Sequence, residues 1–257
     1  MKFALAAIIF SIALGVTAAT TNENDFDAVI QGRNLAQELY EQRPAESFTN
    51  TGVLQIRHKN GVNSQVPISC EIVLTKTNWE STYKTFLVNA MQITQPFATE
   101  ILEITHADDS PNVFLWGRDY PTTPEMEIKS ADFTVRPFAH SDFWVADLSL
   151  DFFHWAEQKV LKHEIRRSRA CAVLESTNPN PSANSYSRVV SWIDNETFGI
   201  VHAEAYDVNG KLLKEFDPKS FKKVNGQWEL QEMEIRNVQT GSRTRLEFDL
   251  KTHDAQS

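Results

Sequence analysis

The sequence VNGQWELQEMEIRNVQTGSRTRLEFDL, residues 224–250, indicates the fold class of the chain. In its last part, RTRLEFDL, apolar residues alternate with charged ones, which is typical of a strand with one buried and one solvated face. The Asn-Gly pair near its start and the later sequence QTGS are suited to tight turns. Between these turns the alternation changes phase, because Trp228 occupies an even position and Met233 an odd one. This slip near Gln231 predicts a β-bulge that curls the sheet.

The period of two extends over most of the chain. Further strand candidates are separated by short turn sequences, and they are residues 53–59, 66–75, 79–88, 97–107, 112–118, 186–194, 198–207 and 211–224. Strands in hairpin order with few helices favour a mainly β fold with a large curved antiparallel sheet or barrel.

One long helix is predicted before the strands. In residues 24–44 apolar side chains recur at helical spacing, Asn24 can cap the first turn, and Pro44 ends the pattern. No repeat or linker interrupts the sequence that follows, so residues 24–251 are expected to form a single domain.

The N-terminus has the features of a secretory signal peptide. Lys2 precedes the apolar run FALAAIIFSIALGV, and small residues up to Ala18 form a processing site. We expect residues 1–18 to be removed by cleavage after Ala18 or Ala19. No cysteine stands directly after this site, so the signal for a lipid anchor is missing and an exported soluble protein is expected. The formal net charge of −9 disfavours a nucleic-acid partner, because phosphate binding needs a basic surface.

Cys70 and Cys171 are the two cysteines of the chain. Each lies in phase with the apolar residues of a predicted strand, which indicates two buried free thiols. An exported protein reaches an oxidising compartment, so a disulfide between them is the alternative that the sequence leaves open.

The sequence predicts no catalytic site, no metal site and no cofactor. HEIRR lacks the second histidine of the helical zinc motif H-E-x-x-H, and neither G-x-S-x-G nor G-x-G-x-x-G occurs. Two combinations of metal-ligand residue types, His140 with Asp142 and His106 with Asp108 and Asp109, consist of residues that are common in exposed loops. A protein that is not an enzyme is therefore expected, with a hydrolase as the weaker alternative.

The segment SDFWVADLSLDFFHW, residues 141–155, has five aromatic rings in fifteen positions. Its apolar and polar residues alternate as in a strand, yet they also fit a helix. In the helix one stripe would contain Trp144, Leu148, Phe152 and Trp155. The rings either fill the open side of the sheet as core or line a cavity for an apolar ligand.

A second unusual segment is basic, in an otherwise acidic chain. This basic segment, residues 159–169, contains Lys159, Lys162, Arg166, Arg167 and Arg169. Its side chains either cover a solvated strand face or form a docking patch for anionic lipid headgroups or an acidic partner.

Four motifs follow one another in the C-terminal third: a strand ending in S-W-x-D, a Y-D-x-x-G-K-x-x-K turn, a G-x-W-x-x-x-x-M segment and a T-x-L strand. Their residues are Ser191, Trp192 and Asp194; Tyr206, Asp207, Gly210, Lys211 and Lys214; Gly226, Trp228 and Met233; and Thr244 and Leu246. This series resembles the outer-membrane lipoprotein-sorting protein family, of the LolA/LolB type. The likeness is strongest over residues 186–250 and covers residues 24–251 loosely.

The resemblance implies a half-open β-barrel in which an N-terminal helix and a short aromatic-rich helix close the mouth over an apolar cavity. It thereby favours the helical interpretation of residues 141–155. Its implied function is a soluble periplasmic carrier or chaperone for the acyl chains of lipoproteins or other lipids, acting in outer-membrane sorting without catalysis. Implied partners are the cargo and inner- and outer-membrane lipoprotein-handling proteins, and the protein is expected to be a monomer.

On this plan nine side chains are expected to line the cavity. They are Phe114, Trp116, Phe143, Trp144, Leu148, Phe152, Trp155, Trp192 and Trp228. The alternative is a filled barrel that serves as an interaction or scaffolding module in the envelope. Loops such as ADDSP and NPNPSANS are longer than in the family, so the resemblance leaves the cargo open.

Overall fold

The computed structural model describes residues 20–86, 98–107, 110–118, 126–128, 133–224 and 227–250. The predicted signal peptide and its cleavage site lie outside the described residues. Among the helices in the described part, none is long and apolar enough to cross a membrane.

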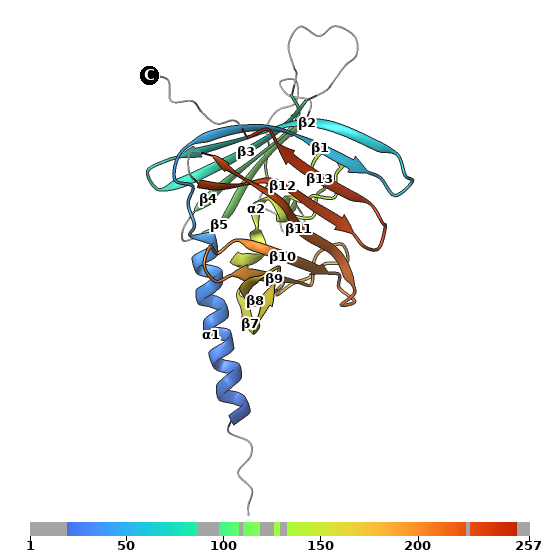
Figure 1. The fold of residues 1–257 in the computed structure, drawn as a ribbon. Coiled ribbons are helices and arrows are strands. Elements are labelled where there is room, and N and C mark those ends of the chain that lie inside the picture. Colours follow the sequence, from blue (N-terminus) through green and yellow to red (C-terminus); the bar gives the residue numbers. More distant parts are fainter. Residues whose placement is uncertain are drawn as a thin grey trace, which may run out of the picture.

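The described chain forms one antiparallel sheet of thirteen strands (Figure 1). The strands are β1 (Phe48–Arg57), β2 (Asn63–Leu74), β3 (Asn78–Phe86), β4 (Ala98–Ala107), β5 (Ser110–Arg118), β6 (Met126–Ile128), β7 (Glu157–Arg166), β8 (Arg169–Thr177), β9 (Arg188–Asp194), β10 (Ile200–Tyr206), β11 (Leu212–Val224), β12 (Gln227–Asn237) and β13 (Arg243–Phe248). Their order in space is β6-β5-β4-β3-β2-β1-β13-β12-β11-β10-β9-β8-β7. The sheet is curved, and it is not closed because β6 and β7 remain its two edges. The prediction of a mainly β fold with a large curved antiparallel sheet is confirmed.

The predicted irregularity in β12 is present. Ser220 of β11 pairs with Glu232, whereas the next residue, Phe221, pairs with Leu230, so Gln231 has no partner in the register. An extra residue in one strand increases the local twist and bends the strand. The bulge therefore contributes to the curvature that distinguishes a concave from a convex face.

The concave face carries the apolar core. Along β1, Leu54 and Ile56 are buried, and Thr244, Leu246 and Ile235 of the neighbouring strands are buried with them. The residues between them in each strand point to the convex face, because successive side chains of a strand alternate.

Helix α1 (Thr20–Tyr40) packs against strand β7. At Gly32 a Cβ atom would lie 2.6 Å from the carbonyl carbon of Gln158, so only glycine permits this approach of the two backbones. Ala36 is buried in the same contact, whereas Phe26 is exposed. The N-terminal part of the helix extends beyond the sheet (Figure 1). The helix begins and ends about four residues earlier than the range 24–44 predicted from the sequence.

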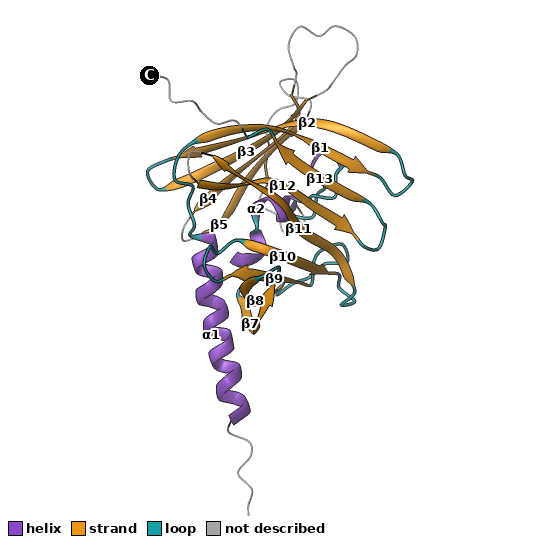
Figure 2. Ribbon diagram, in the orientation of Figure 1, coloured by secondary structure: helices purple, strands orange, loops and turns teal. Residues whose placement is uncertain are grey.

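We call residues 133–155 the plug. It contains η2 (Phe138–His140), α2 (Val145–Ser149) and η3 (Asp151–His154). Figure 2 shows these short helices inside the curve of the sheet. The left-handed backbone of Leu150 (φ 52°) separates α2 from η3, so the segment is helical as expected but is not one continuous helix. The strand interpretation of this segment is wrong.

Both cysteines are buried free thiols. Cys70 lies on β2 and Cys171 on β8, which are separated by six strands of the sheet. The predicted free thiols are thus confirmed, and burial raises the pKa of Cys70 to about 12.

Candidate functional site

The plug gathers most of the predicted cavity residues on the concave face. Seven of the nine belong to the two apolar clusters there or pack against them: Phe114, Trp116, Phe143, Trp144, Leu148, Phe152 and Trp155. Phe143 and Phe152 are buried, and Phe152 packs edge to face on Phe153. The rings thereby form a continuous apolar layer between the plug and the sheet.

The other two tryptophans lie elsewhere. Trp192 points away from the neighbouring core residue Ile193 and packs with Cys171 and Val173 in a small cluster on the opposite face of the sheet. Its indole N–H donates a hydrogen bond to Glu164. Trp228 has an exposed fraction of 71%. Neither side chain joins the apolar layer of the concave face, because strand phase and position place both outside it.

A buried lysine lies in the middle of this layer. The Lys214 side chain is 2% exposed, and its Nζ donates to the carbonyl oxygen of Asp142 at 2.7 Å and to Asp147 at 3.1 Å. The ammonium group also lies 3.6 Å from the centroid of the Trp144 ring, a cation–π contact. Burial lowers the pKa of Lys214 to about 8, although the Asp147 carboxylate opposes this shift.

The acidic partners of Lys214 are themselves fixed by hydrogen bonds. Asp147 accepts the Tyr186 hydroxyl and the Trp144 backbone N–H, each at 2.8 Å. The Asp142 carboxylate accepts a hydrogen bond from the Thr244 hydroxyl at 2.9 Å. The backbone N–H of Asp142 donates a hydrogen bond to the Thr244 hydroxyl oxygen. The Trp144 and Tyr186 rings are stacked with centroids 4.6 Å apart. This network fastens the plug to β11 and β13.

Three spaces border the plug. Beside Phe152 and Phe216 the space has a volume of about 30 Å³, which is far below the size of a ligand pocket. A groove of about 290 Å³ lies between Trp155 and Pro179. A depression of about 390 Å³ opens at the rim of the sheet beside His140. Since ligand pockets usually span roughly 300–1,000 Å³, the rings fill the centre of the concave face, and only its two ends approach ligand size within the described residues.

The described residues contain no group of three or more metal-ligand side chains. His106 is buried, stacks on Trp79 with ring centroids 3.6 Å apart, and shares a hydrogen bond with Ser81. Burial lowers its pKa to about 3. Asp108 and Asp109 lie outside the described part of the chain. His106 therefore has the contacts of a core histidine.

The basic segment lies along β7 and the start of β8, and each of its cations has a partner. Four of them form ion pairs: Lys159 with Asp25, Lys162 with Glu164 at 2.6 Å, Arg167 with Asp217 at 2.8 Å and Arg169 with Asp194 at 2.6 Å. The fifth, Arg166, lies 4.4 Å from the centroid of the Trp192 ring. Internal partners of this kind favour the solvated strand face over the docking patch.

Comparison in sequence identifies the family. A family model described as "Uncharacterized protein" matches residues 89–255, which is more than half of the chain. The chain belongs to this family. No curated protein matches the chain.

Solved structures show that the family member has the LolA-like fold. A DUF1329 family protein from Desulfovibrio piger superimposes with a TM-score of 0.69 at 17% identity, over 90% of this chain and 95% of that one. A putative outer membrane lipoprotein-sorting protein domain from Vibrio parahaemolyticus gives 0.68 at 19% identity, over 89% and 95%. A LolA superfamily protein from Nitrosomonas europaea gives 0.57 at 16% identity, over 87% and 92%. The resemblance read from the four motifs is confirmed at the level of the fold.

The interior lysine network was not predicted, although one motif pointed to part of it. Lys214 closes the Y-D-x-x-G-K-x-x-K turn of this LolA-like chain. In the same turn Asp207 accepts the backbone N–H groups of Asn209 and Lys211, each at 2.9 Å. The motif therefore contains both the residues that form the turn and Lys214, whose side chain reaches the plug.

Proposed function

We propose that this LolA-like protein is an exported, non-catalytic carrier that binds the acyl chains of lipoproteins or other lipids between the plug and the concave face of the sheet. The observation that carries the proposal is the open sheet whose apolar concave face is covered by the plug, a segment of short helices. A half-open barrel covered in this way can expose its apolar face to an acyl chain without separating any two paired strands. Burial of each acyl CH₂ group would contribute about 0.8 kcal/mol to binding.

The volumes define how loading would occur. The central space of about 30 Å³ is too small for an acyl chain, so the plug must move away from the sheet, or the chain must enter from the groove beside Trp155. The likeness to a putative outer membrane lipoprotein-sorting domain supports this function. The predicted signal peptide supports export, and a periplasmic carrier is the form that fits both.

A second candidate is favoured by the same small volume. If the aromatic rings remain in place, the barrel is permanently filled, and the protein would act as an interaction or scaffolding module of the envelope. The buried contacts of Lys214 with Asp142 and Asp147, which hold the plug, are the specific observation in favour of this candidate.

The two candidates are distinguished by locking the plug. Asp142 of the plug and Thr244 of β13 have side-chain oxygens 2.9 Å apart, so the variant Asp142→Cys/Thr244→Cys places two thiols at this contact. We expect the reduced variant to take up a fluorescent fatty acid, the oxidised variant to take up much less, and reduction to restore uptake.

The wild-type protein is the control for the oxidant, because its two thiols are buried in distant strands. Native mass spectrometry of wild-type protein isolated gently from cells should show bound lipid or acylated peptide. Protein that is always empty and takes up no acyl probe in either redox state would contradict the carrier function. It would favour the interaction or scaffolding module with a filled barrel.

A further inference from the structure

Three arginines that are far apart in the sequence lie side by side on the convex face. Arg57 of β1 pairs with Arg243 of β13, and Arg243 pairs with Arg236 of β12. Their neighbours Ile56 and Thr244 point into the core, so the arginines point outward. With neighbouring strands about 4.8 Å apart, this arginine row spans roughly 10 Å.

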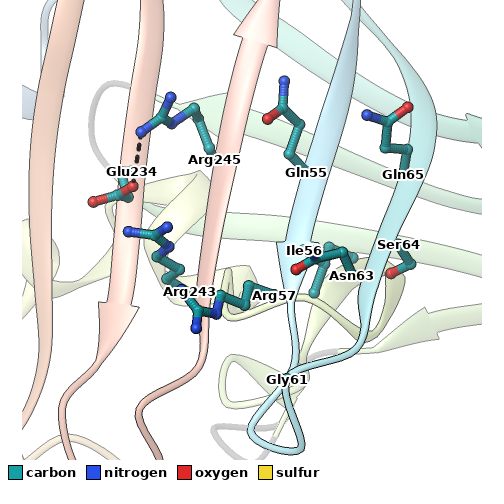
Figure 3. A pocket seen from close by; sticks show the side chains of 10 residues that line it. All are labelled: Gln55, Ile56, Arg57, Gly61, Asn63, Ser64, Gln65, Glu234, Arg243 and Arg245. Carbon is teal, nitrogen blue, oxygen red and sulfur yellow. Dashed lines mark hydrogen bonds and ion pairs between the residues drawn. The ribbon is translucent and has the colours of Figure 1, made fainter.

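The arginines of the row lack ion-pair partners within the described residues. Arg57, Arg236 and Arg243 are exposed, and within the described residues none of them forms an ion pair or hydrogen bond. Figure 3 shows the Arg57 side chain reaching across to Arg243, while Glu234, the acid drawn there, is bound to Arg245 at 3.3 Å. Like charges directly opposite one another destabilise a sheet. The arrangement is therefore suited to an external anion.

The row borders the open rim of the sheet. Three turns meet there: residues 58–62, 207–211 and 238–242, which follow β1, β10 and β12. Figure 1 shows these turns along one side of the molecule, and the Gln239 amide binds Asp207 across two of them at 2.9 Å. The depression beside His140 opens on the concave side of this rim. We call the three turns the turn rim.

Each turn of the rim carries an exposed valine. The exposed fractions are 56% for Val62, 39% for Val208 and 37% for Val238. The turns add the exposed cations Lys59 and Lys211. Exposed apolar side chains between cations are typical of surfaces that insert into the headgroup region of a membrane.

The acids near the rim are fewer than its cations. Asp207 lies in one of the turns and Glu215 stands opposite Arg236, whereas the row and the turns together carry five exposed cations, Arg57, Arg236, Arg243, Lys59 and Lys211. The chain as a whole has a net charge of −9, so an anionic surface would repel most of the molecule and attract this rim.

We infer that the arginine row and the turn rim form a docking surface for the phosphate groups of an anionic lipid bilayer. Guanidinium groups bind phosphate oxygens through paired N–H donors, and the valines enter the headgroup layer. Docking in this orientation brings the depression beside His140 against the lipid surface. This inference goes beyond cargo binding, because it concerns a different face and requires no occupied cavity.

The test is co-sedimentation with vesicles of equal parts phosphatidylcholine and phosphatidylglycerol, compared with phosphatidylcholine alone. We expect wild-type protein to bind the anionic vesicles and to be released by added salt. The variant Arg57→Gln/Arg236→Gln/Arg243→Gln should lose about 100-fold in affinity, at about 5-fold for each arginine. It breaks no internal ion pair, so it should fold, and the corresponding Arg→Lys variant should retain most of the binding.

The matched control is Lys159→Gln/Lys162→Gln/Arg166→Gln, which removes the same charge from the basic segment and should bind almost as wild type. Val62→Ser/Val208→Ser/Val238→Ser should weaken binding about 10-fold, and this loss should persist in salt. Wild-type protein that ignores anionic vesicles, or an equal loss in both charge variants, would overturn the inference.

Two further results would also overturn it. Binding of inorganic phosphate that depends on the arginine row, without vesicle binding, would make the row a small-anion site. Binding of polyglutamate that is insensitive to the valine substitutions would assign the rim to an acidic polypeptide. The arginine variant should still take up the fluorescent fatty acid, so failure of docking and failure of cargo binding are separate outcomes.

Discussion

The two concentrations of basic side chains in this protein have opposite environments. In the basic segment five cations lie within residues 159–169, and each has a carboxylate or an aromatic ring as its partner. In the arginine row three cations from three strands stand opposite one another and form no ion pair in the described structure. The first group is integrated into the fold, whereas the second remains available to an external anion.

The difference shows what strand pairing does to charge. Neighbouring residues of one strand point to opposite faces, so a basic run is divided, and acids on α1, β9 and β11 then meet its members. Pairing between strands has the opposite effect, because residues that pair on neighbouring strands lie side by side on the same face of the sheet. In this protein the row of like charges is therefore assembled across three strands of the sheet.

The largest change in stability is expected where helix α1 covers the basic segment. Gly32→Ala would place a Cβ atom against the backbone of Gln158 and Lys159. We expect the free energy of unfolding to fall by about 3 kcal/mol, the upper range for overpacking, as measured by urea denaturation. Gln31→Ala on the same helix is the control, because Gln31 is exposed and should change stability by less than about 0.5 kcal/mol. Equal stability of the two variants would contradict close packing of α1 on β7.

The next largest effect is expected where a cation of the basic segment pairs with a buried acid. Asp194 is 3% exposed, and Arg169→Gln leaves its carboxylate without its cation. We expect a loss of about 2 kcal/mol in the free energy of unfolding at neutral pH. Lys162→Gln is the control, because the Lys162 side chain is exposed and its ion pair with Glu164 should contribute less to stability than the pair with a buried acid.

The pH dependence of this pair has a definite sign. Burial alone would raise the pKa of Asp194, but the Glu196 backbone N–H and the Arg169 guanidinium outweigh burial and lower it. Since the folded-state pKa is lowered, the pair stabilises the fold above the ordinary pKa of an aspartate and loses this contribution as the pH falls below it. The stability gap between wild type and Arg169→Gln should therefore shrink on acidification. A gap that stays constant from neutral pH to about pH 3 would contradict this linkage.

How much the sequence predicts depends on the range of the interaction. The alternation of apolar residues predicts the sheet, and the phase slip predicts the bulge at Gln231, because both are local patterns. The break of the plug at Leu150 and the burial of Lys214 depend on packing between distant segments. Trp192 shows the same limit, since the plan implied by the family resemblance placed it in the cavity while its strand phase places it on the other face. The arginine row depends on the register of β1, β13 and β12, which no local pattern contains.

The smallest change in stability is expected when the arginine row is removed, and this change tests whether its three arginines repel one another. If the three arginines only repel one another, Arg57→Gln/Arg236→Gln/Arg243→Gln should raise the free energy of unfolding by about 0.5 kcal/mol at low salt. Arg243→Gln alone should give most of this gain, because Arg243 stands between the other two. Urea denaturation at low and high salt measures the effect, and screening should remove it. A loss of stability would mean that an acid of the protein neutralises the row, and the contrast with the basic segment would disappear. A gain would show that the three arginines repel one another in the folded protein.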